Sequence, residues 1–218
     1  MRNKILLVFA LLPAFCSAVA LAQAPKDGVY ISDEEIQSVL KHSAEIHRTI
    51  PDNTIRVIDM GQYQLGVAVV QRGALKPAGG ASAAGGGNVA PAAAANAAQA
   101  CGEKRAGATG PNGIFHDDTA ESYVVVSGGG TLITGGTIVN GKRSGPTDEV
   151  TTVLNGPSCA GTMVGYTSRN VKVGDVIIIP EHVPHGFSAI PDHITYLSIR
   201  PDLKKVLKHG YVNPALKQ

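Results

Sequence analysis

The sequence of 218 residues has no tryptophan, and aromatic residues make up only 5% of it. Charged residues are also few, at 17%, and they form no basic block. Nucleic-acid-binding surfaces are rich in clustered Lys and Arg and use aromatic rings for base stacking. We therefore expect no nucleic-acid partner.

The N-terminal segment has the pattern of a secretory signal peptide. Arg2 and Lys4 precede an apolar run from Ile5 to Ala14, and Ala20 and Ala22 provide a small-x-small cleavage site. We predict that residues 1–22 are removed. No later segment is apolar over a length that spans a bilayer, so no membrane association is expected after cleavage. The predicted location is the periplasm or the extracellular space.

Cysteine is scarce as well, with three residues in the chain. Cys16 lies in the predicted signal peptide, which leaves Cys101 and Cys159 in the mature protein. An even number of cysteines in an oxidising compartment favours a disulfide between them. The alternative is two unpaired, buried thiols. A zinc site built on cysteine is not favoured, because no Cys-x-x-Cys spacing occurs.

The N-terminal part of the mature chain, residues 23–53, contains a predicted helix. Ser32 and Glu35 form a capping box, and apolar residues follow at helical spacing, which predicts a helix over 33–48. Residues 54–60 and 63–71, rich in Val and Ile, then predict two strands.

A compositional break follows these strands. Residues 76–100 are almost all Ala and Gly, interrupted by Pro77 and Pro91, and they show no apolar periodicity. This composition favours a disordered surface insertion over a helix, and a tolerated insertion over a functional lid.

Beyond Gly110 the sequence is typical of an all-β domain, with short apolar segments separated by Gly, Pro, Asn and Asp. Residues 201–207 predict a short closing helix within a tail of residues 201–218. The barrel itself is expected to span residues 54–200. Its strands in this region are predicted at 123–126, 130–134, 137–139, 149–154, 162–166, 176–179, 186–190 and 194–199.

Two segments carry candidate ligands for a metal. In the first, His116 precedes a strand in which Glu121 and Tyr123 share one face, because side chains alternate along a strand. In the second, His185 follows an apolar strand that ends at Pro180. Two imidazoles and one carboxylate suit a divalent transition metal.

The same two segments resemble the two motifs of the cupin family. His116, Glu121 and Gly128 match the second histidine, the glutamate and the final glycine of the first motif. The second motif resembles the run from Gly174-Asp175 through Pro180 to His185-Gly186-Phe187. The resemblance implies an all-β jelly-roll barrel with an N-terminal helix and a short C-terminal helix. It also implies that His116, Glu121 and His185 are metal ligands.

The first motif departs from the family pattern at one position, and two registers remain open. In one register Ile114 stands where the family has its first histidine. In the other, His116 is that first histidine and Asp118 takes the place of the second, which would make Asp118 a fourth ligand. The ion is expected to be Fe, Mn, Ni or Zn.

The resemblance implies a small-molecule substrate or ligand inside the barrel, and it favours a homodimer. Oxygenase and isomerase chemistry both fit, with Glu121 and Tyr123 as the catalytic candidates. The alternatives are a non-catalytic cupin that binds a sugar or other small molecule without a metal, and a structural storage protein. Because one fold hosts many chemistries, the sequence does not choose among them.

Overall fold

The computed structural model describes residues 24–77 and 99–216. The predicted signal peptide and almost all of the Ala/Gly-rich insertion lie outside these residues. None of the helices in the described ranges is long and apolar enough to cross a membrane. The elements are, in chain order, α1 (Asp33–Glu45), β1 (Asp52–Asp59), β2 (Gln64–Arg72), β3 (Ala100–Cys101), β4 (Asn112–His116), β5 (Glu121–Thr134), β6 (Thr137–Arg143), the π-helical turn η1 (Val150–Leu154), β7 (Ser158–Val164), β8 (Thr167–Lys172), β9 (Val176–Ile179), β10 (His185–Ala189), β11 (Ile194–Asp202) and the 3₁₀ turn η2 (Pro214–Leu216).

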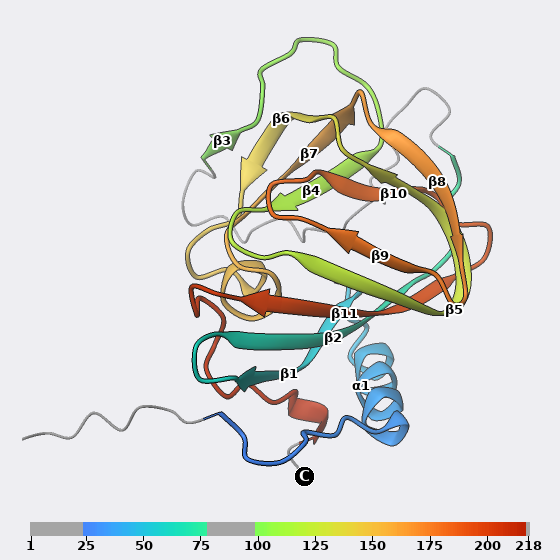
Figure 1. Cartoon of the computed structure of the whole chain (residues 1–218). Helices are drawn as coiled ribbons and strands as arrows, with labels where there is room; N and C mark the ends of the chain where they lie inside the picture. Colours follow the sequence, from blue (N-terminus) through green and yellow to red (C-terminus); the bar gives the residue numbers. More distant parts are fainter. Residues whose placement is uncertain (1–23, 78–98, 217–218) are drawn as a thin grey trace, which may run out of the picture.

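The strands form two antiparallel layers that share the long strand β5 (Figure 1). The first part of β5 pairs with β11 and β9, and its second part pairs with β8 and β10. The order β1-β2-β11-β5 builds one layer, and β10-β4-β7-β6-β3 continues from β5 into the other. The predicted all-β jelly-roll fold is therefore confirmed.

Gly128 lies where β5 passes from one layer to the other. Its backbone has a φ of 66°, which is accessible to glycine at little cost, and a Cβ added there would lie 2.0 Å from the carbonyl oxygen of His193. This requirement gives a physical reason for glycine at the end of the first motif.

The main core fills the space between the two layers. It contains side chains from β2, β5, β8, β9, β10 and β11, and the short segment after β10, with aromatic contacts between Tyr123 and Tyr196 and between Tyr196 and Phe187. A second cluster surrounds the bond between Cys101 and Cys159. That disulfide, predicted from the cysteine count, is present and joins β3 to β7.

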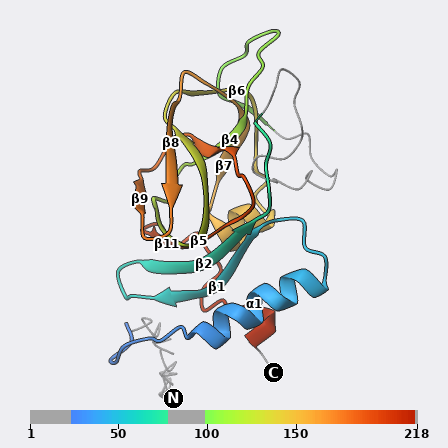
Figure 2. The ribbon, with the colours of Figure 1, turned by 90° about the vertical axis from the view of Figure 1, so that its right-hand side faces the viewer.

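Helix α1 packs against the outer face of β1 and β2, at the end of the barrel away from β8 (Figure 2). It buries Val39 against Ile55 and Val69. The capping box between Ser32 and Glu35 is confirmed, since each residue's side chain accepts from the backbone N–H of the other. The helix ends at Glu45 and not at residue 48, because the chain turns at Ile46 and His47 has a positive φ.

Several predicted elements need correction. Residues 149–154 do not form a strand; most of them form the π-helical turn η1. The predicted strands 123–126 and 130–134 are parts of the single strand β5, and β4 and β8 were not predicted at all. The predicted helix over 201–207 is absent, since β11 extends to Asp202 and turns follow it; the helical turn of the C-terminal segment is η2.

Candidate metal centre

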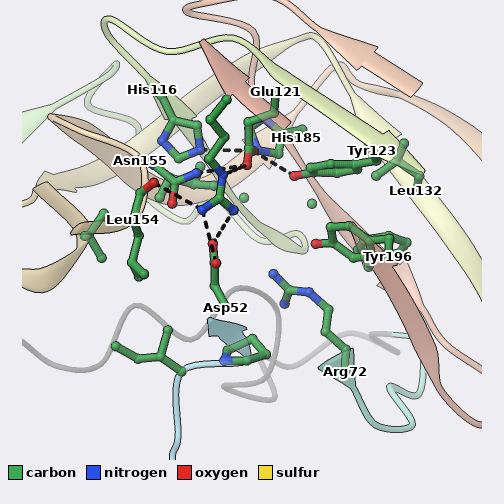
Figure 3. A pocket seen from close by; sticks show the side chains of 18 residues that line it. Asp52, Arg72, His116, Glu121, Tyr123, Leu132, Leu154, Asn155, His185 and Tyr196 are labelled. Carbon is green, nitrogen blue, oxygen red and sulfur yellow. Dashed lines mark hydrogen bonds and ion pairs between the residues drawn. The ribbon is translucent and has the colours of Figure 1, made fainter. Parts of the chain in front are cut away.

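His116 is the last residue of β4 and points into the barrel (Figure 3). Strand pairing places Ser158 of β7 opposite it, and the His116 Nδ1 lies 2.7 Å from Ser158 Oγ. The Ser158 hydroxyl donates its one proton to the carbonyl of Gly156 over 2.8 Å. Ser158 Oγ must then accept from His116 Nδ1–H, which leaves the lone pair of the neutral imidazole on Nε2.

His185 is the first residue of β10 and reaches the same point from the other side. Its Nδ1 lies 2.9 Å from the backbone carbonyl of Val183, which can only accept a hydrogen bond. The proton is therefore on Nδ1, and in the neutral ring Nε2 carries the lone pair. An outer hydrogen bond of this kind orients a histidine for metal ligation.

Glu121 begins β5, and its two carboxylate oxygens have different surroundings. Oε1 accepts three hydrogen bonds, from Asn155 Nδ2 at 2.9 Å, from Ser198 Oγ at 2.8 Å and from Arg200 Nε at 2.8 Å. Oε2 lies 3.2 Å from His116 Nε2 and 3.0 Å from His185 Nε2. The three donors thus fix which oxygen faces the two histidines.

The charge states follow from burial and from Arg200. Burial by itself would raise the pKa of Glu121, but the Arg200 guanidinium holds it well below the usual range, so the carboxylate is ionised. Burial lowers the pKa of His116 despite the nearby Glu121 carboxylate. A neutral His116 therefore lies beside an anionic Glu121.

This set of donors fits a cation. The lone pair on His116 Nε2 faces the anionic Oε2 atom of Glu121, and His185 Nε2 lies 3.0 Å from the same oxygen. Ligand atoms of the three buried residues all lie within 4.8 Å of one another. Such an arrangement is repulsive unless a proton or a metal ion lies between the atoms, and two imidazoles plus one carboxylate suit a divalent transition metal.

The two registers of the first motif differ at Ile114 and Asp118, and the structure places these two residues differently. Ile114 precedes His116 by two residues on β4, and both line the cavity. Asp118 lies in the turn after β4, where its carboxylate contacts the ammonium group of Lys204 and does not join the three-residue cluster. The arrangement therefore matches the register in which Ile114 occupies the place of the first histidine.

Tyr123 and Tyr196 line the cavity beside the cluster. The Tyr123 hydroxyl donates to Glu121 Oε2 over 2.8 Å. Burial and the Glu121 charge raise the pKa of Tyr123 well above its usual value, so the hydroxyl keeps its proton at neutral pH. Tyr123 can therefore donate a hydrogen bond in this site, but its neutral hydroxyl is a poor base.

Sequence reasoning missed the charged network behind the cluster. Arg200 is 1% exposed and extends from Glu121 to Asp52, with Nη2 and Oδ2 2.5 Å apart. One signal for it was available: Tyr196, Ser198 and Arg200 alternate along β11, so the arginine shares the inward face of the strand. No pattern in the sequence predicted that Asn155, just after η1, would reach Glu121.

Two motif segments that are far apart in the sequence thus meet inside one antiparallel jelly-roll barrel. The motif residues His116, Glu121 and His185 converge there, and Gly128 permits the bend of the shared strand. The fold is an all-β jelly roll, as the resemblance of the two motifs to the cupin family implied.

Comparisons with solved structures find distant similarities to this barrel. A protein from Bacillus halodurans is similar to it over 88% of this chain and 93% of that one, with 12% identity and a TM-score of 0.37. A cupin protein from Bacteroides fragilis matches 68% of this chain and 72% of its own, with 14% identity and a TM-score of 0.27. The CENP-C cupin domain of Drosophila melanogaster matches 77% of this chain and 97% of its own, with 11% identity and a TM-score of 0.29. No family model matches the sequence, and no curated protein is a significant match.

Proposed function

We propose that this cupin holds a divalent transition metal at His116, Glu121 and His185 and receives a small organic molecule in the adjoining cavity. The observation that carries the proposal is the convergence of two histidine Nε2 atoms on one oxygen of an ionised carboxylate. Hydrogen bonds donated by Nδ1–H orient both rings for this role. Three protein ligands on one side leave coordination positions free for a ligand.

A bound metal of this type supplies Lewis-acid chemistry or activates oxygen, so an oxygenase or an isomerase are the enzyme classes that we propose. The protein itself positions the ligand groups and excludes water from the cavity. Arg200 and Asn155 hold Glu121 in one orientation, and Tyr123 offers a hydrogen-bond donor beside it. Ile114 and Phe187 give the cavity apolar walls.

Metal titration of the purified mature chain tests this proposal. We expect one equivalent of Mn²⁺ or Zn²⁺ to bind and to raise the midpoint of thermal unfolding. His116→Ala and His185→Ala should each abolish that binding. His182→Asn is the matched control, because His182 is exposed and lies at a positive φ that asparagine tolerates. A wild-type chain that binds none of Fe, Mn, Ni and Zn would contradict the proposal and favour a metal-free binding protein.

We further propose that the protein works outside the cytoplasm. The signal-like N-terminus and the disulfide between Cys101 and Cys159 support export, because such bonds persist in oxidising compartments. Fractionation of expressing cells, with the mass of the mature N-terminus, tests the predicted cleavage after Ala22. Light scattering of the mature chain tests the homodimer expected from the cupin resemblance; a monomer would overturn that expectation.

A further inference from the structure

Arg72, the last residue of β2, turns its guanidinium into the cavity that contains the metal centre (Figure 3). Its Nε is buried and has no hydrogen-bond partner. No carboxylate within the described ranges forms an ion pair with it, whereas the other cavity arginine, Arg200, is bound to both Glu121 and Asp52. The rest of the guanidinium has the Tyr196 hydroxyl as a partner. A buried donor without a partner is costly, so the Nε–H of Arg72 is prepared for an acceptor that the protein itself does not provide.

The surroundings of Arg72 favour a planar anion. The Tyr196 hydroxyl faces the guanidinium, and the Phe187 ring centroid lies 5.8 Å from Cζ. The two aromatic rings make the surface beside the guanidinium apolar, apart from the hydroxyl of Tyr196. A guanidinium in such a place presents a rigid fork of N–H groups that matches the two oxygens of a carboxylate.

Arg72 also stands where two cavities meet. A second cavity lies between α1 and the end of β2, and both cavities are lined by Pro51 and Arg72. The guanidinium therefore lies at the boundary between the outer cavity and the cavity of His116 and His185. Its position suits the selection of a charged group at one end of a ligand.

The charges of the inner cavity point the same way. Arg72 and Arg200 balance Asp52 and Glu121, so these four groups sum to zero. A divalent cation at the cluster would leave an excess of positive charge in a largely apolar enclosure. An anionic ligand compensates that excess, and Arg72 is the cavity arginine whose buried Nε still lacks an acceptor.

We propose that Arg72, with the Tyr196 hydroxyl, binds the carboxylate of a small organic acid whose other end lies at the His116, Glu121 and His185 centre. The part of this proposal that concerns the other end rests on the proposed metal function. The carboxylate site itself is made of protein groups and does not require the metal. A phosphate is less suited, because a dianion needs more donors than one guanidinium and one hydroxyl.

Calorimetric titration of the full mature chain tests the assignment, before and after loading with Mn²⁺. The probes are acetate, glycolate, lactate, pyruvate and succinate, with lactamide as the uncharged partner of lactate and inorganic phosphate as the competing anion. We expect at least one carboxylate to bind the wild type and lactamide not to bind. Arg72→Met should raise the Kd for that carboxylate by about 10- to 100-fold. Arg72→Lys should bind that carboxylate more tightly than Arg72→Met and less tightly than the wild type, because lysine keeps the positive charge but lacks the paired N–H donors of the guanidinium.

Arg169→Met is the matched control, since Arg169 is exposed on β8 and should leave carboxylate binding unchanged. Thermal unfolding of each variant identifies any that fails to fold, and Tyr196→Phe then provides a milder second variant with a smaller loss of affinity. The proposal is overturned if no carboxylate binds, if Arg72→Met and Arg72→Lys bind as tightly as the wild type, or if phosphate binds more tightly than every carboxylate.

The two proposals fail in different ways. If Mn²⁺ binds but no carboxylate depends on Arg72, the metal function stands and the carboxylate site is wrong. If no metal binds but a carboxylate still depends on Arg72, the carboxylate site stands and the metal function is wrong.

Discussion

The Nε of Arg200 donates to Oε1 of Glu121 over 2.8 Å, and it is the one charged group among the three donors that leave Oε2 to face the two histidines. The same guanidinium binds both oxygens of Asp52 through Nη1 and Nη2. Arg200 therefore holds together a β5 residue of the candidate metal centre and a β1 residue that lines the same cavity. The pKa of Arg200 is raised despite burial, because both carboxylates favour its charged form.

Replacing Arg200 with methionine should be among the most destabilising single changes in the chain. It leaves Glu121 and Asp52 with unbalanced negative charge in a buried place, and the loss of a partner from a buried ion pair costs about 3–5 kcal/mol of unfolding free energy. Metal affinity should fall by about 10- to 100-fold, because Glu121 loses the contact that orients it. Urea unfolding and metal titration measure the two effects.

Arg143→Met is the control for this change. Arg143 also pairs with an aspartate, Asp117, but its side chain is 37% exposed. A partly exposed pair of this kind contributes about 0–1 kcal/mol. Equal urea midpoints for Arg200→Met and Arg143→Met would show that the buried network is not what stabilises the barrel.

The strand pattern and the two motifs were enough to predict the barrel and the convergence of His116, Glu121 and His185 inside it; that these residues bind a metal stays a prediction. Alternation placed Glu121 and Tyr123 on one face, and the structure has both lining the cavity. The motif spacing joined His116 to His185, which are far apart in the sequence and both within 3.2 Å of Glu121 Oε2. These predictions succeeded because they depend on local periodicity and on a spacing that resembles a known pattern.

The errors came where tertiary contacts override local preference. Residues 150–154 have the composition of a strand, yet they coil into η1, with Val150 and Leu154 buried beside the cavity. Pro201-Asp202 resembles a helix start, but the Asp202 carboxylate accepts from the backbone N–H groups of Val206 and Leu207 and closes a turn instead. Arg200 was missed because arginine is rarely buried, and only its two carboxylate partners explain it.

The disulfide should contribute substantially to stability. Cys101 and Cys159 are separated by 58 residues. In the chain-entropy model a closed loop of that length stabilises the fold by about 4 kcal/mol. We expect the Cys101→Ala and Cys159→Ala double variant to unfold at a correspondingly lower urea concentration. Reductant should lower the midpoint of the wild type but not that of the variant; a wild type that is indifferent to reductant would contradict this prediction.

The contact between helix α1 and β1 should be sensitive to acid. The hydrogen bond from Arg56, assisted by the backbone N–H of Ser32, lowers the pKa of Glu35 from its usual value of 4.5, even though burial opposes the shift. A carboxyl group whose pKa is lower in the folded state stabilises the fold above the unfolded value, and this stabilisation is lost as the pH falls through the folded value.

Urea unfolding of the wild type and of Glu35→Gln across this pH range checks the prediction. The wild type should be more stable at neutral pH, and the difference should shrink as the pH falls below 4.5. In a protein that already carries Arg56→Met, adding Glu35→Gln should change the pH dependence of the unfolding free energy very little. The reason is that the hydrogen bond from Arg56 is the largest cause of the lowered pKa of Glu35. A difference that stays constant from neutral to acidic pH would refute the assignment.

Ile114→His tests which register of the first motif describes this chain. Ile114 and His116 line the same cavity from alternate positions of β4, so a histidine at this position should add an imidazole to the three proposed ligands. A further nitrogen ligand should tighten Zn²⁺ or Mn²⁺ binding by an amount on the order of tenfold. Asp118→Ala is the complementary change and should leave the affinity unchanged, because that carboxylate is held by Lys204. The opposite pair of results, no gain from Ile114→His and a loss from Asp118→Ala, would assign the second histidine's place to Asp118, and the turn after β4 would then have to rearrange when metal binds.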